Sequence, residues 1–337
     1  MSKNPVQSKT LLILIPLFNE EKNVISITKA IENVFKEINN CNYEVLFVDD
    51  GSTDDTLLEI KKIVRKKSNI FYLSLSKNFG KDTALMAGFH QIHKNIDAVI
   101  TLDADHQHPP ELIPELIKYW QNGYDIVYTY RDQNDKNSSF LSTLPSRVFY
   151  CIISKLAEVK LENGLSDYKL IDQKIFSLIK NFKEDLPFFR GLFKWVGFKQ
   201  IGIPYKPDAR LNGKTKYCTT TLIKLALNSI ISFSTRPLTL AIYIGFFTSF
   251  ISILYIPYVL FSVYKGYAIS GWSSTIATIA FFGGIQLIVL GIIGIYLGKI
   301  FIQTKNRPQY IINESNLSDD NSCTKQIEKN QKMDIFR

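Results

Sequence analysis

The sequence predicts an α/β fold: a Rossmann-like, mostly parallel sheet that is doubly wound, with helices on both faces. Apolar runs at 11–17, 43–48 and 71–75 are typical of buried strands. Each is followed by polar turn residues and then by an amphipathic stretch. This alternation of strand and helix indicates a parallel sheet covered by crossover helices. The 337 residues suffice for one large domain with an appendage.

Further elements continue the same alternation. The other expected strands are 98–102, 126–130 and 166–171, and the expected helices are 21–38, 56–66, 82–93, 111–120, 146–159 and 172–179. Asn19 is the expected N-cap of the first helix. Pro109 and Pro110 mark the start of the helix at 111–120. The polar residues 132–142 are expected to form a loop.

The run 98–102 is followed directly by two carboxylates, Asp103 and Asp105. Ligands of open α/β sheets bind at the carboxyl ends of strands. Two oxygen ligands there suit a hard divalent cation, Mg²⁺ or Mn²⁺, that also holds a diphosphate. The alternative is that the two aspartates cap the following turn. Glu20, Asp49 and Asp50 fall at other strand ends, and such a cluster repels itself unless it binds a cation or ligand groups.

The C-terminal third is strongly apolar. No residue is charged between Arg236 and Lys265, nor between Lys265 and Lys299. Each interval exceeds the ~20 residues that cross a bilayer, so we expect two transmembrane helices, 238–261 and 275–302, rather than buried core helices. The predicted organisation is an α/β domain at 1–218, an amphipathic interface helix at 219–235, a membrane region at 236–303 and a polar, disordered tail at 304–337.

Charge and cysteine content restrict the partners. The net charge is +9, and basic residues are spread over the soluble part and flank the apolar part, which favours a membrane surface or a phosphorylated ligand. No dense basic run or recognition motif indicates nucleic acid. Basic residues gather outside the two apolar segments, so the positive-inside rule places the soluble domain in the cytoplasm. The four cysteines have no paired spacing and are expected to be reduced thiols.

Six short motifs stand along the chain: PLFNEE at 16–21, VDDGSTD at 48–54, NFGK at 78–81, LDAD at 102–105, QHPPE at 107–111 and GKTKY at 213–217. In this order they resemble the motifs of family 2 inverting glycosyltransferases, which have the GT-A fold. With its two apolar C-terminal segments, the chain looks most like the bactoprenol (polyprenyl-phosphate) glycosyltransferases, to which the dolichol-phosphate mannose synthases are related. The resemblance covers about residues 11–303.

The resemblance implies roles for the matching residues. It implies a metal site at Asp103, Asp105 and Gln107, and a nucleotide-sugar site at Pro16, Phe18, Glu20, Asp50, Lys81, Asp103 and Ala104. It implies catalytic roles for Asp167, Asp105 and Arg131, and contacts with the acceptor phosphate for Arg147, Arg190, Lys214 and Lys216.

Three of these roles have alternatives. Asp167 matches the position of a catalytic base, yet a phosphate monoester with a second pKa near ~6 is already ionised at neutral pH. Asp167 would then orient an arginine or the sugar. Lys214 and Lys216 could instead be attracted to anionic lipid headgroups. Arg147 could belong to an ordinary amphipathic helix.

The function implied is inverting transfer of a hexose from a nucleotide sugar to undecaprenyl phosphate, with Mg²⁺ or Mn²⁺ as cofactor. The donor is expected to be UDP-glucose or another UDP-hexose. The alternatives are use of GDP-mannose, as in dolichol-phosphate mannose synthases, and a non-catalytic membrane module that handles lipid-linked sugar. The expected location is the bacterial inner membrane, as a multi-pass protein. A homo-oligomer is expected, because two helices offer little packing within the membrane.

Overall fold

The computed structural model describes residues 8–38, 41–93, 95–131, 164–182, 189–206, 236–265 and 272–317. These residues belong to two compact units. The first is an α/β unit that takes its described residues from 8–206 and 308–317. The second is a helical unit that takes its described residues from 236–307. Each unit is considered by itself.

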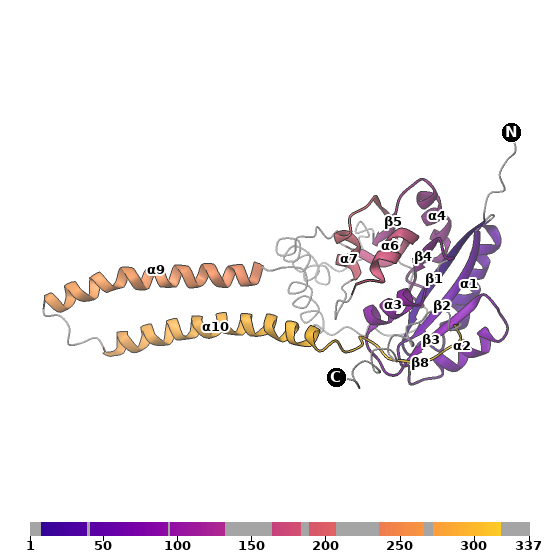
Figure 1. Cartoon of the computed structure of the whole chain (residues 1–337). Helices are drawn as coiled ribbons and strands as arrows, with labels where there is room; N and C mark the ends of the chain where they lie inside the picture. The colour runs from indigo at the N-terminus through magenta and orange to yellow at the C-terminus, as the bar shows by residue number, and fades with distance from the viewer. Residues whose placement is uncertain are drawn as a thin grey trace, which may run out of the picture. The chain divides into compact units, whose positions relative to one another are not determined.

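The α/β unit is built on an eight-stranded sheet with the strand order β7-β5-β6-β4-β1-β2-β3-β8. Figure 1 labels β1 to β5 and β8 of this sheet. The strands are β1 Lys9–Leu17, β2 Cys41–Asp49, β3 Ile70–Leu75, β4 Ala98–Thr101, β5 Ile126–Arg131, β6 Leu165–Asp172, β7 Gln200–Tyr205 and β8 Ile312–Ser315. Strands β1 to β4 pair in parallel, and so do β5 and β7. Strand β6 is antiparallel to both of its neighbours, so its first residues lie at the same edge of the sheet as the last residues of β4.

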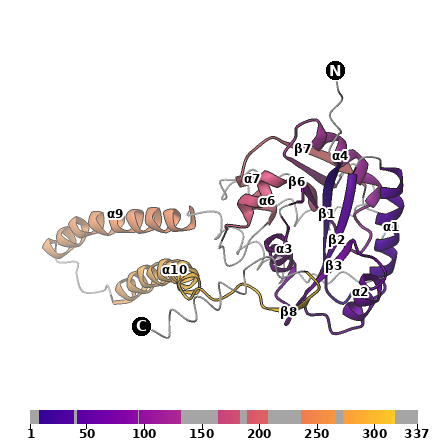
Figure 2. The ribbon, with the colours of Figure 1, turned by 45° about the vertical axis from the view of Figure 1, so that its right-hand side comes forward.

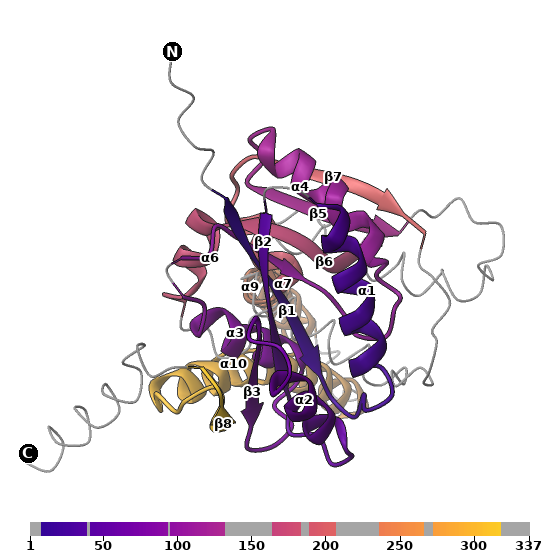
Figure 3. The same ribbon diagram turned by 90° about the vertical axis from the view of Figure 1, so that its right-hand side faces the viewer.

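Helices cover both faces of this sheet (Figures 2 and 3). One face carries α1 (Val24–Glu37), α2 (Thr56–Val64) and α4 (Ile113–Gln121), preceded by the 3₁₀ turn η1 (Pro110–Leu112). The other carries α3 (Lys81–His90), α6 (Gln173–Ile179) and α7 (Phe189–Trp195). Alternate residues of β1 face the two layers: Leu11, Ile13 and Ile15 pack toward α1, and Leu12 and Leu14 pack toward α3. The predicted doubly wound α/β architecture is therefore confirmed.

Helix α1 begins later than the sequence pattern indicated. Asn23, not Asn19, precedes its first turn. Asn19 has a φ of 54°, and its side-chain oxygen accepts a hydrogen bond from the Thr53 backbone N–H at 2.9 Å. The prediction that Asn19 is an N-cap is thus wrong, because its amide side chain joins the β1–α1 loop to the β2–α2 loop.

The C-terminal segment also differs from expectation. A disordered tail was predicted from 304 onward, but α10 extends to Thr304 and β8 pairs antiparallel with β3. Asn316 extends the contact, because its side-chain oxygen accepts a hydrogen bond from the Tyr72 backbone N–H at 2.6 Å. Glu314 forms a 2.5 Å ion pair with Lys61. For Ile312–Ser315 the prediction is wrong, since this strand completes the edge of the sheet.

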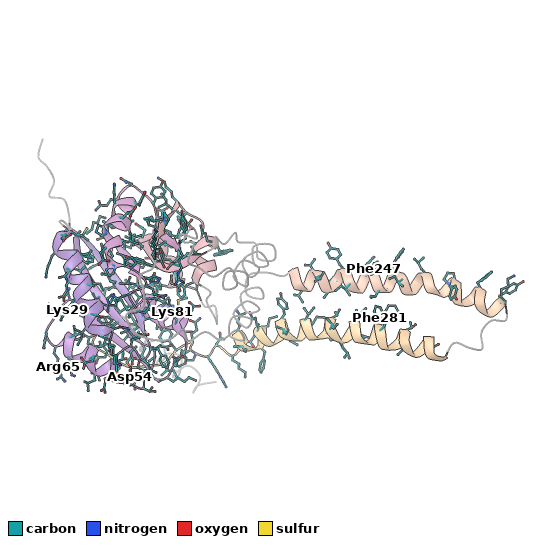
Figure 4. All side chains as sticks on the ribbon, turned by 180° about the vertical axis from the view of Figure 1, so that it is seen from behind. Lys29, Asp54, Arg65, Lys81, Phe247 and Phe281 are labelled. Carbon is teal, nitrogen blue, oxygen red and sulfur yellow. The ribbon has the colours of Figure 1, made fainter. Side chains whose placement is uncertain are left out.

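The helical unit contains two apolar helices, α9 (Arg236–Tyr264) and α10 (Trp272–Thr304), which lie side by side. Figure 4 shows side chains such as Phe247 and Phe281 standing out from them, and both are more than 60% exposed. Within the described residues one stretch, Phe281–Thr304, is long and apolar enough to cross a membrane. In α9 the continuous apolar stretch is the shorter Leu238–Ile251. The interface helix expected at 219–235 lies outside the described residues.

Candidate active site

The carboxylate of Asp50 lies at the end of β2 and holds the loop that leads into α3. Its two oxygens accept hydrogen bonds from the backbone N–H groups of Phe79 and Gly80, at 2.7 and 2.9 Å. Burial raises the pKa of Asp50, and the two amide hydrogen bonds oppose this effect only in part. Asp50 therefore ties the carboxyl end of β2 to the start of α3, the helix that follows β3.

Gly51 allows the turn after β2 to lie against the loop that leads into α3. Its φ is +65°, and a Cβ at this position would lie 2.3 Å from the backbone carbonyl carbon of Lys77. A side chain here would clash with main chain that cannot turn aside. The glycine that follows Asp50 is thus a steric requirement of the Asp50–Gly80 contact.

Lys81 is the first residue of α3, and its ammonium bridges two carboxylates. The Nζ atom lies 2.6 Å from Asp103 Oδ1 and 2.9 Å from Asp167 Oδ2. Burial alone would lower the pKa of Lys81, but the attraction of Asp103 and Asp167 outweighs it and raises the pKa. For Asp103, burial alone would raise the pKa, but attraction by Lys81 outweighs it and lowers the pKa. Lys81 and Asp103 are therefore both charged at neutral pH.

His108 holds the end of β4 from within the core. Its Nδ1 accepts a hydrogen bond from the Asp103 backbone N–H at 3.1 Å, and its Nε2 lies 2.7 Å from Ser166 Oγ. A ring nitrogen that accepts from an N–H carries no proton, so the imidazole is neutral and its Nε2–H donates to Ser166. Burial lowers the pKa of His108, which agrees with this assignment. The residue positions Asp103 through its backbone, and no local sequence signal indicated the contact with Ser166.

Asp167 reaches the site from the start of β6. The Thr101 hydroxyl donates to the Asp167 carbonyl oxygen at 2.5 Å, across the antiparallel pairing of β4 with β6. The side chain of Asp167 is only 11% exposed, with one oxygen on Lys81. The sequence indicated Lys81, Asp103 and Asp167 separately, and the structure brings them together.

The other predicted residues at the end of β4 form a second chain of contacts. Asp105 Oδ1 accepts a hydrogen bond from the Gln107 backbone N–H at 3.1 Å, and Gln107 Oε1 accepts from Arg131 Nη2 at 3.0 Å. Arg131 is the last residue of β5 and is exposed. The structure thus places Arg131 beside the predicted metal-binding turn.

The donor set at this turn fits a metal that arrives with a diphosphate. Asp103, 26% exposed, and Asp105 supply hard carboxylate oxygens. Among the described residues, no group of three histidine, cysteine, aspartate or glutamate side chains could hold a metal by itself. Mg²⁺ commonly uses one or two carboxylates and takes its remaining ligands from substrate phosphates and water. The neutral His108 is engaged on both nitrogens and is not a candidate ligand.

The remaining predicted residues are placed less directly. Pro16 lies in β1 opposite Val48, and Phe18 follows the same strand and is partly buried. The Glu20 carboxylate accepts a 2.6 Å hydrogen bond from Asn23, and Ala104 is buried. Arg147, Lys214 and Lys216 lie outside the described residues, as does the side chain of Arg190 in α7.

A mostly parallel α/β sheet with carboxylates and a lysine at the carboxyl ends of its strands is the architecture of nucleotide-binding enzymes. The sequence model of one family, glycosyl transferase family 2, matches residues 12–178. The chain belongs to this family: it is a glycosyltransferase with a GT-A α/β domain.

Relatives cover nearly the whole chain. CsbB of Bacillus subtilis (strain 168), a glycosyltransferase by name, is 39% identical over 306 residues, which are 90% of this chain and 92% of that protein. The SfII prophage-derived bactoprenol glucosyl transferase of Shigella flexneri is 36% identical over 304 residues, with 90% and 97% covered. A solved structure of glucosyl-3-phosphoglycerate synthase from Mycobacterium tuberculosis, with Mn²⁺ and UDP, aligns at 17% identity and a TM-score of 0.45, covering 66% of this chain and 78% of that one.

Proposed function

We propose that this glycosyltransferase moves glucose, from UDP-glucose or another UDP-hexose, onto undecaprenyl phosphate with inversion at the anomeric carbon. The observation that carries the proposal is the Lys81–Asp103–Asp167 cluster at the carboxyl edge of the sheet. Support for the acceptor comes from a relative named bactoprenol glucosyl transferase, which matches along 90% of this chain. The product is a polyprenyl-monophosphate sugar.

The residues at the ends of β1, β2 and β4 bind the donor. We assign Pro16, Phe18, Glu20, Asp50 and Ala104 to the walls around the nucleotide sugar, and Asp103 and Asp105, with Gln107 nearby, to the metal and diphosphate. A divalent cation there, Mg²⁺ or Mn²⁺, would neutralise the charge that develops on the departing diphosphate. Lys81 lies 2.6 Å from Asp103 and adds a positive charge where the diphosphate would bind.

The acceptor phosphate is the nucleophile. Its oxygen attacks the anomeric carbon while the bond from that carbon to the diphosphate breaks, so no proton has to be removed from an ionised phosphate. We assign Arg131, Arg147, Arg190, Lys214 and Lys216 to holding this phosphate, because guanidinium and ammonium groups suit phosphate oxygens. Asp167, held by Lys81, orients the sugar or an arginine rather than acting as a base. The rate then depends mainly on alignment of the two substrates.

The membrane arrangement completes the proposal. Phe281–Thr304 in α10 is long and apolar enough to span a membrane, and we propose it as one span and α9 as the second, which would make the protein multi-pass. Two crossings would return the chain to one side, and the basic residues outside both segments support a cytoplasmic catalytic domain. Residues 219–235 would lie along the inner membrane surface, and helices from further copies would pack against α9 and α10 in a homo-oligomer.

A donor screen tests the function. Purified full-length protein is mixed with undecaprenyl phosphate, a divalent metal and each of a panel of nucleotide sugars that includes UDP-glucose and GDP-mannose. The mass of the lipid product is measured by mass spectrometry. We expect a product one hexose heavier with UDP-glucose. Asp103→Ala and Asp105→Ala should each lower the rate by about 100-fold or more.

Glu115→Ala is the matched control, because Glu115 is an exposed acid on α4. It should transfer sugar at the wild-type rate. A product formed only from GDP-mannose would replace the donor assignment. Hydrolysis of donor without any lipid product would remove the acceptor assignment. Full activity of Asp103→Ala would remove the metal site.

A further inference from the structure

The contacts of Lys81 indicate a role in addition to binding the donor's diphosphate. Its ammonium is the shared partner of two carboxylates that come from different strands, Asp103 after β4 and Asp167 in β6. The three side chains are between 11% and 33% exposed, so water screens them only in part. The lysine therefore supplies the positive charge that lets two partly buried carboxylates lie close together.

The backbones that carry these side chains are fixed. Asp50 accepts hydrogen bonds from the two amides just before Lys81. His108 accepts one from the amide of Asp103, and the Thr101 hydroxyl donates to the carbonyl of Asp167. The lysine side chain, by contrast, is a flexible four-carbon stem that carries a compact charge. A rearrangement of this cluster is therefore confined to side chains, and the Lys81 side chain is the most flexible of them.

The metal proposed for the donor requires the same Asp103 oxygens that Lys81 contacts at 2.6 and 2.8 Å. A dication and an ammonium cannot both lie within contact distance of one carboxylate without strong repulsion. The donor itself brings diphosphate oxygens, which are a new anionic partner for the ammonium. The Lys81 ammonium thus has two alternative sets of anionic partners: the carboxylates of Asp103 and Asp167, and the diphosphate of the donor.

We propose that Lys81 is an exchangeable counter-ion that couples donor binding to the release of Asp167. When the metal and a nucleoside diphosphate sugar bind, the ammonium leaves Asp103 and Asp167 for the diphosphate, and Asp167 turns to the sugar or to the acceptor's binding groups. Lys81 is in this sense a positioning residue. The class of donor in this statement rests on the proposed function, whereas the competition between Lys81 and a metal does not.

The test measures metal binding without donor or acceptor. Full-length wild type, Lys81→Gln and Lys81→Arg are titrated with Mn²⁺, and free Mn²⁺ is followed by its electron paramagnetic resonance signal. Lys81→Gln should bind Mn²⁺ about 10-fold tighter than wild type or better, because the competing cation is gone. Lys81→Arg keeps the charge and should bind Mn²⁺ as weakly as wild type does.

Lys77→Gln is the matched control. It removes the same charge from the loop that leads into α3, but Lys77 is exposed and lies over the Phe79 ring. Its Mn²⁺ affinity should equal that of wild type. Thermal unfolding gives a second readout: in a chelator Lys81→Gln should unfold at a lower temperature than wild type, and Mn²⁺ should restore it.

Equal Mn²⁺ affinity of Lys81→Gln and wild type would overturn the proposal. So would an equal change in the Gln and Arg variants, because that result would indicate structural damage rather than charge. Neither measurement contains a sugar or a lipid. A wrong donor or acceptor in the proposed function therefore leaves these outcomes unchanged, and the two failures can be told apart.

Discussion

The ends of β2 and β4 both present carboxylates at the same edge of the sheet, but the two regions hold them differently. At the end of β2, both oxygens of Asp50 are engaged by backbone amides, those of Phe79 and Gly80. At the end of β4, the oxygens of Asp103 are engaged by the ammonium of Lys81. Burial raises the pKa of Asp50, whereas the attraction of Lys81 exceeds the effect of burial and lowers the pKa of Asp103.

This comparison shows that the carboxylates of Asp50 and Asp103 can serve different functions because their hydrogen-bond partners differ. A backbone amide belongs to the fold and cannot leave its acceptor unless the loop unfolds. An ammonium on a flexible stem can leave when another cation arrives. We therefore infer that the β2 end is architectural and that the β4 end is exchangeable. Substitutions at the β2 end should act on stability, and substitutions at the β4 end should act on binding and rate.

The largest effect on stability is expected at the β2 end, from Gly51→Ala. The new Cβ would meet the backbone of Lys77 at 2.3 Å, and the φ of +65° disfavours any side chain. We expect a loss of about 2–5 kcal/mol in the free energy of unfolding. Gly123→Ala separates the two causes, because Gly123 has a φ of +84° and open space around it.

Gly123→Ala should lose only the part of the free energy of unfolding that comes from the positive φ, about 1–2 kcal/mol. Both variants are compared with wild type by thermal unfolding in detergent. If the two substitutions prove equally mild, the close approach of the β2 turn to the Lys77 backbone is not needed for the fold.

A smaller loss is expected from Asp50→Asn. Asparagine keeps the shape but has one acceptor oxygen, so its amide nitrogen would face a backbone N–H. One buried amide would then lose its partner, at a cost of about 1–3 kcal/mol. Asp103→Asn should show the reverse pattern, with little change in unfolding temperature and a loss of transfer of about 100-fold or more. Equal stability losses in both variants would contradict the distinction between the two strand ends.

Much of this architecture follows from local patterns. Apolar runs and their spacing predicted β1 to β6 within a few residues, because the burial of a strand depends mainly on its own side chains. The same reasoning placed Asp103 and Asp105 at a strand end. It also identified Lys81 and Asp167 through family motifs, but only one at a time.

The contacts between these residues could not be predicted from short stretches of sequence, because they join residues that lie far apart along the chain. Lys81 and Asp167 are 86 residues apart, and they meet because β6 lies antiparallel beside β4. Strand β8 is short and mostly exposed, so it has no apolar alternation to detect, and its pairing with β3 depends on a chain segment far away in sequence. Asn19 looked like a cap, but its partner is Thr53 on another loop.

The smallest expected effect is a difference in pH dependence, measured with a chelator present. A carboxyl whose pKa is lowered in the folded state contributes stability that is present above the unfolded pKa, near ~4, and lost as the pH falls through the folded pKa. The small stability advantage of wild type over Asp103→Asn at neutral pH should therefore disappear as the pH falls below about 4. Asp50 has a raised pKa, so its ionised form opposes folding, and wild type should gain relative to Asp50→Asn as the pH falls through the folded pKa of Asp50. Thermal unfolding of the three proteins from neutral to acidic pH should give slopes of opposite sign, and slopes of the same sign would mean that both carboxylates are held in the same way.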